Sequence, residues 1–126
     1  MSRLFNVEVF NQSIGGVSTS APTYVSGTEF NALLGSAEKL KVQIIVDAIA
    51  AASTTVSVTF EYNNAMQDNT WATGSTATVA VAAIADLPAS GFMTLSAPAD
   101  LAAYGRFRVG ANQNATVRII VCGWSG

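Results

Sequence analysis

The sequence contains no histidine, and this absence removes the side chain that most often acts as a general base and most often binds metal. Ser-His-Asp and Cys-His catalytic arrangements are therefore excluded. The eight acidic residues are spread along the chain without the spacing of an EF-hand loop, and the glycines match no phosphate-binding loop. A glycosidase-type carboxylate pair would need Glu61 and Asp68 to approach in the fold. We expect a protein that is not an enzyme and that uses no cofactor and no metal.

Charge is also scarce, because charged residues make up 11% of the chain, against about 25% in a typical soluble domain. Low self-repulsion suits a protein that stays in contact with other proteins, although a β-rich domain with Ser and Thr on its exposed faces would show the same composition. The net charge of −2 argues against a nucleic-acid partner. No apolar run approaches the ~20 residues of a membrane helix, and no secretory signal is visible at the start, so no membrane partner is expected.

Cysteine is limited to Cys122, which cannot form an internal disulfide. In the last predicted strand this residue is better explained as a small packing residue than as a nucleophile.

Apolar and polar residues alternate in several segments, which is the signature of half-buried β-strands. The clearest segments are Arg3–Phe10, Lys39–Val46, Thr54–Tyr62 and Thr76–Ala83, with shorter extended pieces near Thr23–Val25 and Phe92–Leu95. Seven or eight short strands separated by turn signals predict an all-β fold, namely an antiparallel, jelly-roll-like β-sandwich. Residues 1–126 are expected to form this single domain.

Residues 11–38 show no period, and Gly15-Gly16, Pro22 and Ser26-Gly27 interrupt any regular element. Thr28–Gly35 is compatible with one helical turn, or with a turn whose leucines plug the end of the sandwich. Long connections in compact domains are often functional. We therefore expect residues 11–38 to be irregular and to bind a partner. The first strand carries apolar residues on both faces, which suggests cover by a neighbouring element or by another subunit.

The last segment, Leu101–Trp124, reads as two strands joined by a polar loop, and a hairpin in which Val109 pairs with Val117 would have one apolar face. That register places Arg108 directly opposite Arg118, and two like charges in this position destabilise the sheet unless a negative charge compensates them. Glu61, Asp47 or Glu8 on an adjacent strand could provide that charge through a salt bridge, and so could an acidic patch on a partner.

Two tryptophans leave a second kind of site open. Trp71 follows the polar loop that begins at Asn63, and aromatic rings can stack on sugars. The alternative ligand face consists of Tyr62, Asn63, Asn64, Asp68 and Trp71. Packing is the preferred explanation of both rings, with Trp71 closing the end of the sandwich beside Tyr62 and Trp124 capping the terminal strand.

Two stretches resemble a known family. Residues 40–71 run from a strand through a second strand ending in Glu61 to a polar loop and Trp71, and Tyr104–Val109 with Ala115–Val121 forms a similar end. This pattern resembles the small β-sandwich head decoration, or cement, proteins of tailed bacteriophages. The chain departs from it at Asp68-Asn69, where Asp-Gly is common, and residues 11–38 have no counterpart in it.

The resemblance implies a viral structural protein that binds the outside of an assembled capsid and stabilises it. The implied partners are the major capsid protein and further copies of this chain, as a dimer or trimer, on a virion assembled in the bacterial cytoplasm. The expected contact residues are Arg3, Phe5, Phe10, Tyr24, Phe30, Arg106, Arg108 and Arg118. A carbohydrate-binding or receptor-binding module of a fibre, and a subunit of a tail tube or neck, remain as alternatives.

Overall fold

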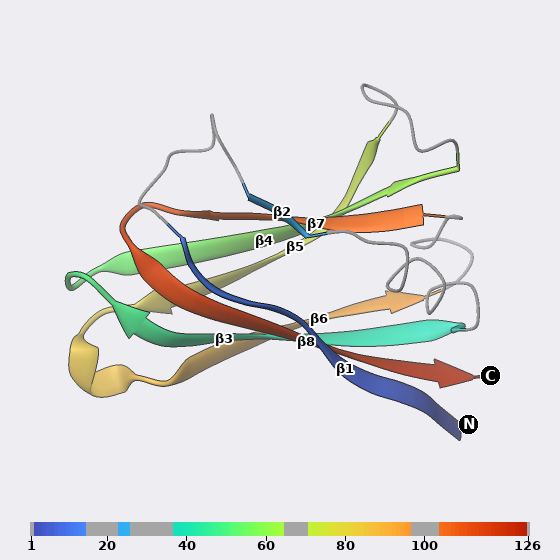
Figure 1. Ribbon diagram of the computed structural model, residues 1–126, viewed down its shortest axis with the longest axis horizontal. Helices are drawn as coiled ribbons and strands as arrows, with labels where there is room; N and C mark the ends of the chain where they lie inside the picture. The colour runs from blue at the N-terminus through green and yellow to red at the C-terminus, as the bar shows by residue number, and fades with distance from the viewer. Residues whose placement is uncertain (1, 15–22, 26–36, 65–70, 97–103, 126) are drawn as a thin grey trace.

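The computed structural model describes residues 2–14, 23–25, 37–64, 71–96 and 104–125. These residues form eight strands and one short 3-10 helix, η1, spanning Ile84–Asp86 (Figure 1). The strands are β1 (Ser2–Ile14), β2 (Thr23–Val25), β3 (Lys39–Ile49), β4 (Thr54–Asn63), β5 (Ala72–Val81), β6 (Ala89–Ser96), β7 (Tyr104–Ala111) and β8 (Ala115–Ser125).

The strands form two four-stranded sheets that pack against each other. Sheet A has the order β1-β8-β3-β6 and sheet B the order β2-β7-β4-β5, and every pairing is antiparallel. The first strand pairs with the last in sheet A, and the second pairs with the seventh in sheet B, as in a jelly roll. The two termini consequently lie side by side at one end (Figure 1). The predicted jelly-roll-like sandwich is confirmed.

The core lies between the sheets and follows the predicted alternation. On β4, Val56, Val58 and Phe60 point inward and are fully buried. Phe60 and Phe107 are paired on the neighbouring strands β4 and β7 of sheet B, and their ring centres lie 5.4 Å apart with the ring planes at 57°, a tilted geometry that aromatic pairs favour. Phe107 is also fully buried, as are Leu40, Val42, Ile44, Val46, Val81, Leu95, Val109, Val117, Ile119 and Val121.

The predicted closing hairpin is wrong, because β7 lies in sheet B and β8 in sheet A. The loop between them is tied to both sheets. The side chain of Asn112 accepts a hydrogen bond from the amide of Thr55 at 2.8 Å and donates one to the carbonyl of Ser53 at 3.2 Å. The carbonyl of Asn114 accepts a hydrogen bond from the amide of Ala50, just after β3, at 2.9 Å. The loop therefore carries the chain from one sheet to the other.

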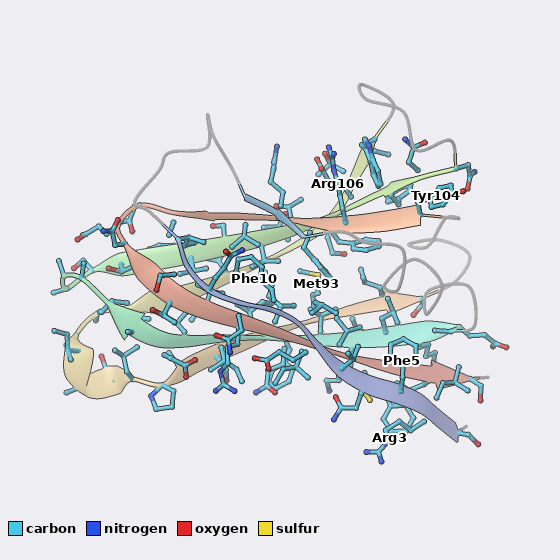
Figure 2. The ribbon with its side chains drawn as sticks, in the orientation of Figure 1. Arg3, Phe5, Phe10, Met93, Tyr104 and Arg106 are labelled. Atoms are coloured by element: carbon cyan, nitrogen blue, oxygen red, sulfur yellow. The ribbon has the colours of Figure 1, made fainter. Side chains whose placement is uncertain are left out.

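Two irregularities in β1 change the predicted faces of the first strand. Its pairing with β8 shifts register between Arg3 and Phe5 and again between Glu8 and Phe10, as a β-bulge does. After the second bulge, Phe10 pairs with Ile119 and is buried, whereas simple alternation assigned it to the face of Glu8. Figure 2 shows Phe5 and Phe10 directed toward sheet B and Arg3 directed away from it.

Part of the expected irregular segment is regular. Residues 11–14 continue β1, and the predicted piece at Thr23–Val25 is β2, paired with β7. Phe30 and the proposed turn at Thr28–Gly35 lie outside the described residues, as does the side chain of Tyr24.

Strand β6 is longer than predicted. Ala83 was expected on an inward face, but it is exposed just before η1.

Candidate interaction surfaces

The end of sheet B holds a cluster of Glu61, Arg106 and Trp71. Glu61 and Arg106 face each other on β4 and β7, and Arg106 Nε donates to Glu61 Oε1 at 2.7 Å. The guanidinium carbon of Arg106 also lies 4.4 Å from the ring centre of Trp71, which precedes β5. Only 7% of the Glu61 side chain and 19% of the Arg106 side chain are exposed. The cluster joins β4, β7 and the start of β5, and in Figure 2 Arg106 projects away from sheet A.

This arrangement bears on the alternative ligand face. One face of the Trp71 ring is occupied by Arg106, and Tyr62 is half-buried and packs against the hydrophobic core. Asn63 is buried and Asn64 is exposed, while Asp68 lies outside the described residues. Tyr62 and Trp71 are therefore both half-buried, and the guanidinium group of Arg106 covers one face of the Trp71 ring.

Arg118 forms the second ion pair, on the outer face of sheet A. Its Nε and Nη2 atoms donate to the two carboxylate oxygens of Asp47 at 2.6 and 3.1 Å, the bidentate geometry typical of Arg and carboxylate. This hydrogen bonding raises the pKa of Arg118, with further upward effects from the charges of Asp47 and Glu8 and a downward effect of desolvation. The predicted salt bridges of Arg106 to Glu61 and Arg118 to Asp47 are confirmed.

The predicted apposition of Arg108 and Arg118 is wrong. Arg106 and Arg108 lie on the outer face of sheet B, whereas Arg118 lies on the outer face of sheet A, so Arg108 does not oppose Arg118. Arg108 instead lies between Thr59 on β4 and Tyr24 on β2 in the register of sheet B. Among the residues that the structure describes, none forms an ion pair with Arg108.

The outer face of sheet A carries a group of apolar side chains that the sequence prediction did not single out. Phe92 on β6, which is 54% exposed, Gln43 on β3 and Ile120 on β8 stand in one cross-strand row. Ile45 stands two residues along β3 from Gln43 and is half-buried on the same face. The ammonium of Lys41 lies 5.4 Å from the ring centre of Phe92. We call Ile45, Phe92 and Ile120 the outer patch.

The alternation in β6 contains the signal for this patch. Met93 and Leu95 are alternate residues that are buried on the inner face of β6, so Phe92 between Gly91 and Met93 points to the solvent side. Recognising the patch also requires knowing that β6, β3 and β8 are neighbours, and no local pattern states that.

The expected contact residues of the first strand divide between surface and interior. Arg3 is exposed on the outer face of sheet A, next to Trp124 of β8. Phe5 is half-buried against the core, and Phe10 is buried within it. Phe10 is therefore a core residue and is no longer a candidate for partner contact. Trp124, the expected cap of the terminal strand, is half-buried near the end of β8.

The described residues hold little else that resembles a ligand site. No group of three or more Cys, Asp or Glu side chains among them is placed to hold a metal ion, and none of their helices has the length and apolarity to cross a membrane. Open hollows of about 310 and 280 Å³ lie at the loop end of the sandwich, next to Ile49 and Thr54 respectively. Cys122 is half-buried, as the sequence predicted.

No family model matches the sequence, and no curated protein matches it.

Proposed function

We propose that this protein is a non-enzymatic structural component of a bacteriophage virion, which binds the outside of the assembled capsid and stabilises it. Its partners are the major capsid protein and further copies of itself. The proposal begins from the resemblance of residues 40–71 and 104–121 to head decoration proteins. Jelly rolls occur in viral capsid and lectin domains, so the fold agrees with this proposal without selecting it.

The residues on which the resemblance rests meet in the cluster at the end of sheet B. The features that carry the resemblance are a strand with Glu61 near its end, a Trp after a polar loop, and the strand that contains Arg106, and these come together in one set of contacts. Their role here is to hold three chain segments in place. In a family whose members have these residues in common, the residues would serve to stabilise the fold. The surface that binds the partner would then lie elsewhere on the domain.

The observation that carries the proposed binding surface is the outer patch. No further layer of the described residues covers the outer face of sheet A, and Phe92 is more than half exposed there. Exposed apolar side chains gathered on one face mark interaction sites in many proteins. Charged side chains border the outer patch, since Lys41 lies beside Phe92 and Arg118 pairs with Ile45 across β3 and β8. The charge of Arg118 is already matched within the chain by Asp47. The outer patch thus provides an anchor of the kind that dominates protein interfaces.

Stabilisation would be additive. Each copy that spans neighbouring shell subunits buries apolar and hydrogen-bonding surface on both, and a standard interface of about 1,600 Å² suffices for stable attachment. Many such contacts raise the barrier to rupture without any chemical step.

The test uses shells assembled from the major capsid protein of the same virus. Phe92→Ser removes the exposed aromatic anchor, and we expect it to weaken co-sedimentation with shells about tenfold or more. Ile84→Ser is the matched control, because Ile84 is also apolar and 63% exposed but lies on η1, outside the outer patch. Equal binding by the wild type and Phe92→Ser would refute the role of the patch, and no binding by the wild type would refute the function.

Deletion of the N-terminal residues is a poor test of shell binding. Removal of residues 1–27 would take away β1 and β2, one strand from each sheet, together with the buried side chains of Phe10 and Ile14. Point variants that leave the sandwich intact are needed.

A further inference from the structure

Strand β1 forms one edge of sheet A and is long for an edge strand. It spans 13 residues, and among the described strands of this sheet only β8 pairs with it. Its apolar side chains are incompletely covered, since Leu4 is 43% exposed and Phe5, Val7 and Val9 are half-buried. The unpaired backbone groups of such an edge are a template for pairing with another chain.

We propose that a second copy of this chain pairs antiparallel with β1 along this edge, about a two-fold axis at Asn6, and joins the two A sheets into one continuous eight-stranded sheet. This inference deepens the self-association included in the proposed function by naming the surface and the register. An isologous contact of this kind closes on itself and yields a dimer.

The faces of β1 restrict the possible registers. Side chains paired across two antiparallel strands must point to the same face, so a two-fold axis must pass through a residue position. In β1, the residues that pair with outward residues of β8 are Arg3, Asn6 and Glu8, whereas Phe5 and Val7 pair with inward ones. Leu4 and Val9 are the extra residues of the two bulges and have no position in the pairing with β8. An axis at Asn6 therefore sets Phe5 opposite the partner's Val7 on the inner face.

Charge selects this register from the others. With the axis at Asn6, Arg3 stands opposite the partner's Glu8 on the outer face, because Leu4 is the extra residue of a bulge and is skipped in the pairing. The two-fold symmetry produces this pair twice. Both side chains are exposed, and the effect of Glu8 on the pKa of Arg118 agrees with its place on the outer face. An axis at Glu8 would oppose two like charges, and an axis at Val7 would set Arg3 opposite an asparagine.

The first test exchanges these charges in the isolated full-length protein. Sedimentation equilibrium of the wild type should give twice the 13.0 kDa of one chain. Arg3→Glu and Glu8→Arg each replace two attractive pairs with two repulsive ones, and each should raise the dimer dissociation constant about tenfold. The double variant Arg3→Glu/Glu8→Arg should restore the wild-type value.

A disulfide tests the register directly. Asn6 would face its own copy within disulfide reach, so Asn6→Cys should cross-link two chains under mild oxidation. Asn6 also pairs with Cys122 within one chain, so the experiment needs the Cys122→Ser background. Asn11→Cys in that background is the matched control, because Asn11 also faces outward on β1 but has no counterpart at the proposed axis.

Each result is decisive for this edge. Cross-linking through position 6 but not position 11, with rescue by the double charge exchange, would establish the contact. A wild-type monomer at high concentration, or a dimer indifferent to both single exchanges, would overturn it and would mean that the bulges and charges of β1 protect the edge. Shells are absent from both experiments, so failure here leaves shell binding standing, and failure of shell binding leaves this contact standing.

Discussion

The ring of Phe5 on β1 lies directly over the backbone of Gly123 on β8, in the space that a side chain at position 123 would occupy. A Cβ built on Gly123 overlaps the ring carbons of Phe5. Gly123 is thus the residue that lets the aromatic ring of the edge strand fold inward against the core.

Gly123→Ala should therefore lower the free energy of unfolding by about 1–3 kcal/mol, because overpacking forces Phe5 or β1 to move. Gly110→Ala on β7 is the control, since nothing lies within 4 Å of a Cβ at that position, and it should be close to neutral. Urea denaturation of the two variants measures the difference. An equal effect at the two glycines would contradict the proposed packing of Phe5.

Loss of Arg106 should be costly, because Glu61 would be left as a charge that is nearly buried. Arg106→Met should lower the free energy of unfolding by about 3–5 kcal/mol, the range for removing one partner of a buried pair. Arg118→Met tests the more exposed pair with Asp47, and its effect should be much smaller because water screens such pairs.

The double variant Arg106→Met/Glu61→Gln separates charge burial from packing. If the isolated charge causes the loss, the double variant should recover part of the stability of Arg106→Met. No recovery would assign the loss to the contact between Arg106 and Trp71.

Ser53 adopts a φ of 60°, in the left-handed region, which costs a residue with a Cβ about 1–2 kcal/mol. Ser53→Gly should relieve this strain and raise or preserve the melting temperature. Ser57→Gly, in the extended strand β4, should lower stability by about 0.5–1 kcal/mol. A greater loss at position 53 than at position 57 would show that the turn before β4 does not need this conformation.

Local periodicity predicted the parts of the fold that depend on neighbouring residues. The alternation in residues 39–46 and 54–62 identified both strands and their inward side chains, because a strand buries every second residue whatever its partner. It assigned Phe10 to the wrong face because a bulge inserts one residue, and the bulge depends on the pairing with β8.

Pairing between distant strands could not be predicted in the same way. A polar loop between two amphipathic strands fits a hairpin as well as a crossing between sheets. The crossing at Asn112 depends on hydrogen bonds to residues near 53–55, far away in the sequence. The outer patch was missed for the same reason, since its three side chains come from β3, β6 and β8.

The proposed function is tested most directly by a difference map from electron cryomicroscopy of shells with and without the wild-type protein. We predict added density on the outer surface of the shell at symmetry-related positions, with the outer face of sheet A and Phe92 against the shell subunits. Shells that show no added density, or that carry the protein within the shell wall or on its inner surface, would contradict the proposal.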